Sequence, residues 1–111
     1  MIIINLTDLP KHSLNEIYAG KHWQKRKLAK DTYKLLIKSQ FKEVLSKDKT
    51  YMVCYHFNFK KSPLDVSNTV YMLKMIEDII FEDDSYKIIT DISIKVSKAN
   101  IDFINIKIFD Y

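Results

Sequence analysis

Glycine, proline and cysteine are all scarce in this sequence. Its 111 residues include one Gly, two Pro and one Cys. Flexible linkers and low-complexity segments are rich in glycine and proline, so this composition argues against long disordered stretches. The single cysteine, Cys54, excludes a disulfide bond within the chain and is typical of a protein from a reducing compartment. We therefore expect a cytoplasmic protein with one domain over residues 1–111.

Long apolar runs are also lacking. No segment approaches the roughly 20 apolar residues that cross a bilayer, and the first residues lack the basic region and cleavage site of a signal peptide. The chain is nevertheless 47% hydrophobic, which is enough to bury a core without disulfide or metal staples. The sequence thus predicts a globular domain with no membrane association.

Acidic and basic residues are segregated along the chain. Residues 20–49 hold ten Lys or Arg against three acids, a net charge of +7, whereas residues 62–84 hold one Lys against six acids, a net charge of −5. A basic surface beside an acidic patch is typical of enzymes that act on nucleic acids. The alternative is that the lysines form a solvated helix face.

Hydrophobic periodicity predicts an α+β domain, with a small mixed β-sheet and two main helices in the order strand, helix, strand, helix, strand, strand. The predicted helices cover residues 24–45 and 68–81, and the predicted strands cover residues 1–5, 51–59, 86–97 and 101–109. Only three residues separate the last two strands, a length typical of a hairpin.

The first predicted helix and the second predicted strand both have a clear apolar face. In the helix, the apolar positions are Ala29, Tyr33, Leu36, Ile37 and Val44. Lysines spaced by three or four residues are expected on the opposite face of this helix. In the strand, the alternating positions expected in the core are Tyr51, Val53, Tyr55, Phe57 and Phe59.

Carboxylates flank the second predicted helix on both sides. Asp65 and Asn68 stand at its start, and an Asp83-Asp84 pair follows its end. Mg²⁺ prefers oxygen ligands, commonly one or two carboxylates completed by water and substrate phosphates, and it activates water against phosphodiesters. A 14-residue helix is about 21 Å long. Its two ends therefore share a metal only if the flanking segments fold back, or if a partner subunit supplies one side. Taken singly, Asp65 or Ser67 is a typical helix cap, and the acidic run is typical of a solvated turn.

The two acidic segments resemble the motifs of the RusA family of Holliday-junction resolvases, small endonucleases of phages and prophages. The family pattern is an Asp-x-Asp-Asn motif, a helix, and an Asp-Asp pair that opens the next strand. Residues 65–68 resemble the first part, and residues 83–84 resemble the second. Residues 13–18, followed by residues 20–23, resemble the N-terminal segment of phage members. The likeness thus covers most of the chain from Ser13 onward.

This resemblance implies a homodimer that cuts four-way DNA junctions with Mg²⁺ or Mn²⁺. By position, Asp65 corresponds to the family's first catalytic aspartate, Asp84 to its last, and Asn68 to the motif asparagine. Asp83 is the alternative ligand beside Asp84.

Two positions depart from the family pattern. Ser67 stands where the family has its second aspartate, and Tyr71 stands where it has a helix lysine. Lys74, three residues further along, is the predicted substitute for that lysine. These changes leave three possibilities. The enzyme uses fewer protein ligands, Asp83 compensates for the missing aspartate, or the activity is reduced.

Basic residues around the start of the first helix predict contacts with the DNA backbone. They are Lys21, Lys25, Arg26, Lys27, Lys30, Lys34 and Lys38. Trp23 lies among them, and it either stacks on an exposed base near a junction or packs in the core at the helix start.

The sequence therefore predicts a metal-dependent endonuclease of branched DNA, encoded by a phage or prophage and acting in the host cytoplasm. The predicted catalytic residues are Asp65, Asp84 and Lys74. The predicted metal ligands are Asp65, Asp84, Asp83 and Asn68. The first alternative is a RusA-like DNA-binding protein that keeps the fold and the dimer with weakened activity. The second is an interaction protein whose basic face contacts an acidic partner.

Overall fold

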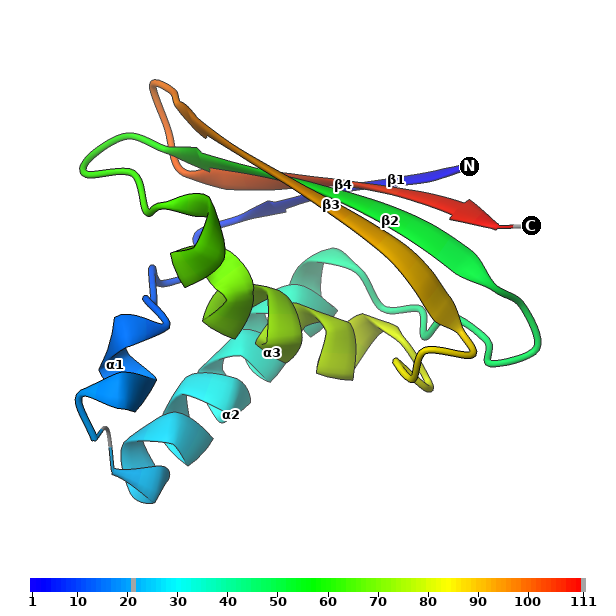
Figure 1. Ribbon diagram of the computed structural model, residues 1–111, viewed down its shortest axis with the longest axis horizontal. Helices are drawn as coiled ribbons and strands as arrows, with labels where there is room; N and C mark the ends of the chain where they lie inside the picture. The colour runs from blue at the N-terminus through cyan, green and yellow to red at the C-terminus, as the bar shows by residue number, and fades with distance from the viewer. Residues whose placement is uncertain (21, 111) are drawn as a thin grey trace.

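Four strands form one mixed sheet in the computed structural model, which describes residues 1–20 and 22–110 (Figure 1). In chain order the elements are β1 (Ile2–Thr7), α1 (Asn15–Tyr18), α2 (Trp23–Gln40), β2 (Tyr51–Phe59), the 3₁₀ helix η1 (Val66–Thr69), α3 (Val70–Ile80), β3 (Ile89–Lys98) and β4 (Phe103–Asp110). The predicted α+β class is confirmed. The predicted order holds for the four strands and the two long helices, and the structure adds α1 and η1.

The strands lie in the order β1-β4-β2-β3. β4 is antiparallel to both β1 and β2, whereas β3 is parallel to β2. The predicted hairpin between the last two strands is therefore wrong, because β2 lies between them. Their connection crosses the end of β2, where the Ala99 N–H donates to the Phe59 carbonyl at 2.9 Å and the Asp102 carboxylate accepts from the Lys60 N–H at 2.6 Å.

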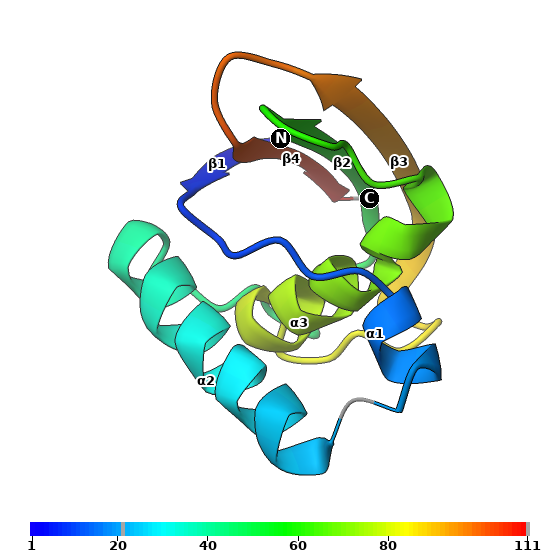
Figure 2. The same cartoon turned by 90° about the vertical axis from the view of Figure 1, so that its left-hand side faces the viewer.

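All the helices lie on the same side of the sheet (Figures 1 and 2). The five β2 residues predicted for the core are buried there, so that prediction is confirmed. They are joined by Ile104, Ile106 and Ile108 of β4. Within the described residues, no helix covers the opposite face of the sheet (Figure 1), where Ile3 of β1 is exposed and the apolar side chains of the two central strands are half-buried. On β2 and β4 these are Met52, Cys54, Phe103 and Phe109.

Helix α2 is shorter than predicted. Its buried residues Ala29, Tyr33 and Ile37 match the predicted apolar face. The helix ends at Gln40 rather than at residue 45, because the chain becomes extended and the backbone of Leu45 bridges that of Phe81. Val44, predicted to be buried, is therefore exposed.

The helix predicted over residues 68–81 begins with a 3₁₀ turn, η1, and continues as α3. Neither predicted cap is used: Asp65 precedes η1 without a side-chain hydrogen bond to it, and Ser67 lies exposed within η1. The Thr69 hydroxyl instead donates to the Val66 carbonyl at 2.6 Å. The apolar face of α3 buries Met72, Leu73, Met75, Ile76 and Ile80. In the part of the chain that the structure describes, no helix is both long and apolar enough to cross a membrane.

Candidate functional site

The segment after α3 folds back along the helix. The Leu45 N–H donates to the Ile80 carbonyl at 2.7 Å, and the Glu82 N–H donates to the Leu45 carbonyl at 2.9 Å, so the chain leaves α3 in a fixed direction. Asp84 then meets a lysine in the middle of the helix, with its Oδ2 atom 2.5 Å from Lys74 Nζ. The fold-back that would bring the flanking acids together is therefore present for Asp84.

Lys74 also lies near a second carboxylate on its own helix. Its Nζ atom is 3.8 Å from Asp78 Oδ1, so the same ammonium group contacts both carboxylates. The hydrogen bond from Lys74 lowers the pKa of Asp84, whereas burial raises the pKa of Asp78. Divergent pKa values in neighbouring acids are typical of functional sites. We call Asp78 and Asp84 the carboxylate pair.

A buried glutamate lies behind this pair. Glu77 is only 3% exposed, and its Oε1 atom accepts a hydrogen bond from the Tyr55 hydroxyl at 3.1 Å. Burial raises the pKa of Glu77 to about 7, and the charges of Asp84 and Asp78 act in the same direction. Glu77 therefore changes its charge near neutral pH, within one helical turn of Lys74 and Asp78.

The other predicted ligands lie apart from the carboxylate pair. Asp65 is exposed at the start of η1, and the residues between it and Lys74 rise by roughly 14 Å. Asn68 is half-buried, and its carbonyl accepts the Leu14 N–H at 3.0 Å. Asp83 Oδ1 accepts the Ser85 N–H at 2.9 Å, as an aspartate in a turn commonly does.

The acids of the described residues meet only the smaller requirement of the metal that the resemblance implies. Within residues 1–20 and 22–110, no three His, Cys, Asp or Glu side chains are grouped so that they could hold a metal ion. Mg²⁺, however, is often bound through only one or two carboxylates, with water and phosphate oxygens as the remaining ligands. The carboxylate pair fits that smaller requirement, because both carboxylates contact the same Lys74 ammonium group.

The predicted DNA-binding residues are distributed over two faces of α2. Lys27, Lys30, Lys34 and Lys38 share one stripe, whereas Lys25 lies about 200° around the helix from Lys27. The first two lysines of this stripe, Lys27 and Lys30, line a hollow together with Tyr71 of α3, so this part of the stripe borders α3 rather than lying opposite it. Lys21 lies outside the described residues.

A groove of about 380 Å³ lies between the helices next to this stripe. Its lining residues are Ile17, Trp23, Arg26, Lys27, Lys30 and Tyr71. Trp23 is 59% exposed, so the alternative that it packs in the core is wrong. We call this the basic groove. Tyr71 relates it to the carboxylate pair, since this tyrosine lines the groove and lies on the same helix as Lys74 and Asp78.

Sequence reasoning missed three residues of this site, namely Tyr55, Glu77 and Asp78. Glu77 gave a usable signal, because it follows Leu73 by four residues and therefore falls on the apolar face of an amphipathic helix. Asp78 follows Lys74 by four residues, which is also the spacing of an ordinary surface ion pair. Tyr55 was assigned only to the core.

Comparison with protein-family models and with curated proteins finds no match for this chain.

The pKa of Glu77 predicts a specific dependence of stability on pH. Because the pKa in the folded state lies above the ordinary value of 4.5, the folded protein holds the proton more tightly than the unfolded chain. The stabilisation of the folded state by this proton is complete below pH 4.5 and is lost as the pH rises to about 7. Glu77→Gln keeps an acceptor for Tyr55 but cannot ionise. We expect its melting temperature, relative to the wild type, to be higher at pH 8 than at pH 5 by roughly 5 °C.

Thermal unfolding followed by circular dichroism at both pH values measures this difference. Glu43→Gln, at an exposed position, is the matched control and should show no such change. If the melting temperature of Glu77→Gln differs from that of the wild type by the same amount at pH 5 and at pH 8, the raised pKa of Glu77 is contradicted.

Proposed function

We propose that this protein is a metal-dependent endonuclease that cuts branched DNA, such as a four-way junction. The observation that carries the proposal is the carboxylate pair, which contacts Lys74 on the helix that also supplies Tyr71 to the basic groove. Phosphodiester cleavage needs acids that can hold a metal and, near them, cations that can hold phosphates. The resemblance to the RusA family supports the same activity.

Each residue of the site has a distinct role in this proposal. Asp78 and Asp84 would hold Mg²⁺ or Mn²⁺, which supplies charge neutralisation and an activated water when bound. Lys74 would turn from Asp84 towards a phosphate oxygen of the substrate. Glu77, held by Tyr55, would position the helix segment that carries Lys74 and Asp78. Asp65 stays a predicted ligand. It could reach the metal only if its segment moved closer to the carboxylate pair, or if it acted on the site of a partner subunit.

The acidic residues give the first test of this proposal. Purified protein should nick a synthetic four-way junction in Mg²⁺ and not in EDTA. Asp84→Asn and Asp78→Asn should each slow cutting by roughly a hundredfold or more, because each removes a metal ligand, while junction binding is retained. Asp65→Asn should have the smaller effect. Asp48→Asn, at an exposed loop position, is the control.

Calorimetric titration with Mn²⁺ provides a readout that does not depend on cutting. We expect Asp84→Asn to weaken Mn²⁺ binding as well as to slow nicking. A wild-type nicking rate in Asp84→Asn would show that the carboxylate pair is not the metal site.

The second candidate is a DNA-binding protein without cutting activity. Ser67 and Tyr71 favour it, since both family side chains are replaced there, and so does the ion pair that engages Asp84 with Lys74. Such a protein would bind the junction equally well in Mg²⁺ and in EDTA and would nick it in neither. The two experiments above therefore separate the candidates.

The lysine stripe of α2 predicts salt-dependent DNA binding. On B-DNA each neutralised phosphate contributes about −0.9 to the slope of log affinity against log salt. We expect Lys30→Ala, Lys34→Ala and Lys38→Ala together to weaken junction binding and to flatten this slope by roughly two to three. The control is a triple substitution of Lys95, Lys98 and Lys107, which lie on β3 and β4. Equal slopes for the two triple variants would favour the alternative that the stripe is only a solvated helix face.

We also propose that the protein acts as a homodimer. A four-way junction is nearly two-fold symmetric, and two matched cuts require two sites related by the same symmetry. The sheet face without helices, where Phe103 and Phe109 are half-buried, is the candidate interface. Light scattering at micromolar concentration should give twice the 13.2 kDa of one chain. A mass of one chain, both free and on a junction, would contradict paired cutting.

A further inference from the structure

The basic groove combines aromatic rings with positive charge. Its floor includes the buried ring of Tyr71 from α3, and one side is formed by Trp23 at the start of α2. Among the described residues that line it, every charged one is basic: Arg26, Lys27 and Lys30. The groove thus offers aromatic surface and positive charge to a ligand with a flat apolar part and a negative charge.

The walls of this groove are held by contacts between segments that are distant in sequence. Figure 1 shows α1, the first turns of α2 and the first turns of α3 on the left-hand side of the molecule. The ring of His12 lies between those of Tyr33 and Tyr71, at centroid distances of 5.8 and 5.6 Å. The Leu14 N–H donates to the Asn68 carbonyl, which fastens the segment before α1 to η1.

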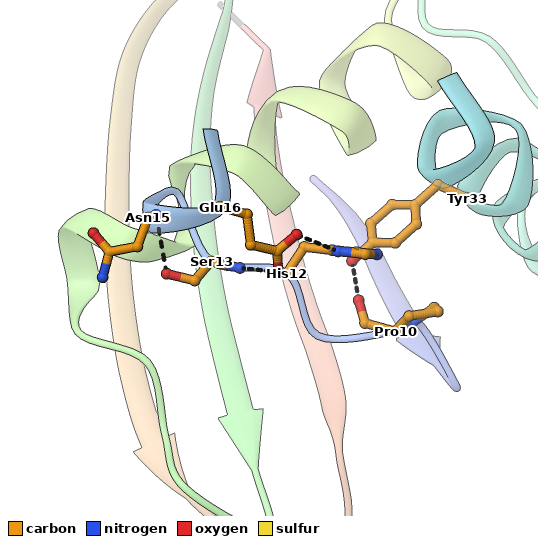
Figure 3. Close-up of polar contacts among 6 residues, drawn as sticks. All are labelled: Pro10, His12, Ser13, Asn15, Glu16 and Tyr33. Carbon is orange, nitrogen blue, oxygen red and sulfur yellow. Dashed lines mark hydrogen bonds and ion pairs between the residues drawn. The ribbon is translucent and has the colours of Figure 1, made fainter. Parts of the chain in front are cut away.

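Glu16 and Tyr33 fix this N-terminal segment further (Figure 3). The Glu16 carboxylate accepts the Ser13 N–H at 3.1 Å and lies 3.1 Å from His12 Nδ1. The Tyr33 hydroxyl donates to the Pro10 carbonyl. Because these bonds hold α1 against α2 and α3, the groove needs little ordering to bind a ligand.

We propose that the basic groove binds one unpaired nucleotide of a DNA strand. The base would stack on Trp23 and contact Tyr71, and its phosphates would lie against Arg26 and Lys30. Stacking on an aromatic side chain is favourable for every base, so it provides affinity without sequence preference. Unpaired bases occur at branch points and flaps, and the inference therefore deepens the proposed function, on which its choice of DNA rests.

The position of the groove also relates the bound base to the candidate cutting site. Tyr71, Lys74 and Asp78 follow one another at spacings of three and four residues, so they share one stripe of α3. Tyr71 and Asp78 are separated by about 10 Å along the helix axis. This separation corresponds to about three phosphate intervals of a stacked strand. The unpaired base would thus lie a few nucleotides from the scissile phosphate.

The fluorescence of Trp23 tests this inference directly, because it is the only tryptophan of the chain. The probes are a short oligothymidylate and an oligonucleotide of equal length whose residues are all abasic, both in EDTA. We expect the first to quench Trp23 fluorescence and the second to bind more weakly without quenching. Quenching by neither probe, or equal binding of both, would overturn the inference.

Anisotropy of a labelled oligothymidylate then allows variants of Trp23 to be compared. Trp23→Ala should weaken binding roughly fivefold to a hundredfold, the range for loss of one stacked base, and Trp23→Phe should restore most of it. Arg26→Gln should weaken the binding of both oligonucleotides alike. Tyr86→Ala, at an exposed tyrosine outside the groove, is the control. Displacement of the oligonucleotide by an acidic peptide at the same concentration would assign the groove to a protein partner instead.

These measurements are separable from the test of the nuclease. Quenching without metal-dependent nicking would support the groove and contradict the proposed cutting activity. Nicking without quenching would support the activity and contradict the groove.

Discussion

Helix α3 is held at both ends by backbone hydrogen bonds to segments that are distant in sequence. At its start, the η1 carbonyl of Asn68 accepts a hydrogen bond from Leu14. At its end, the carbonyl of Ile80 accepts one from Leu45. Its apolar face is buried in the core, so the helix cannot rotate or slide without exposing methionines and isoleucines to water. The side chains on its remaining surface therefore have fixed positions.

That fixed surface carries both parts of the candidate site. Tyr71 contributes to the basic groove, whereas Lys74 and Asp78 contribute to the acidic part. One helix thus sets the spacing between them. Glu77 is the exception on the buried side, where an acid is accommodated because Tyr55 donates a hydrogen bond to it. A buried carboxylate lowers the stability of the fold at neutral pH, which is a cost that functional sites commonly carry.

The sequence predicted those features that depend on local patterns. Alternation in β2 identified five core residues correctly, and the 3.6-residue period located both long helices. The strand order was not predictable in this way, because a three-residue connection is typical of a hairpin and gives no sign that β2 lies between the strands it joins. The carboxylate pair was half predicted: Asp84 stood out in a run of acids, but its partner Asp78 depends on the direction in which the chain leaves α3. That direction is set by Leu45, which is 35 residues earlier than the end of α3.

The pairing of β1 with β4 has a consequence for how the chain folds. Ile4 lies opposite Ile106, so the first strand finds its neighbour only about a hundred residues later. During synthesis, β1 emerges with an open edge, and β4 cannot pair with that edge until residues 103–110 have been made. Contacts of such long range also slow folding, because a large loop must close before they form. β1 thus stays without its partner strand while residues 8–102 are made.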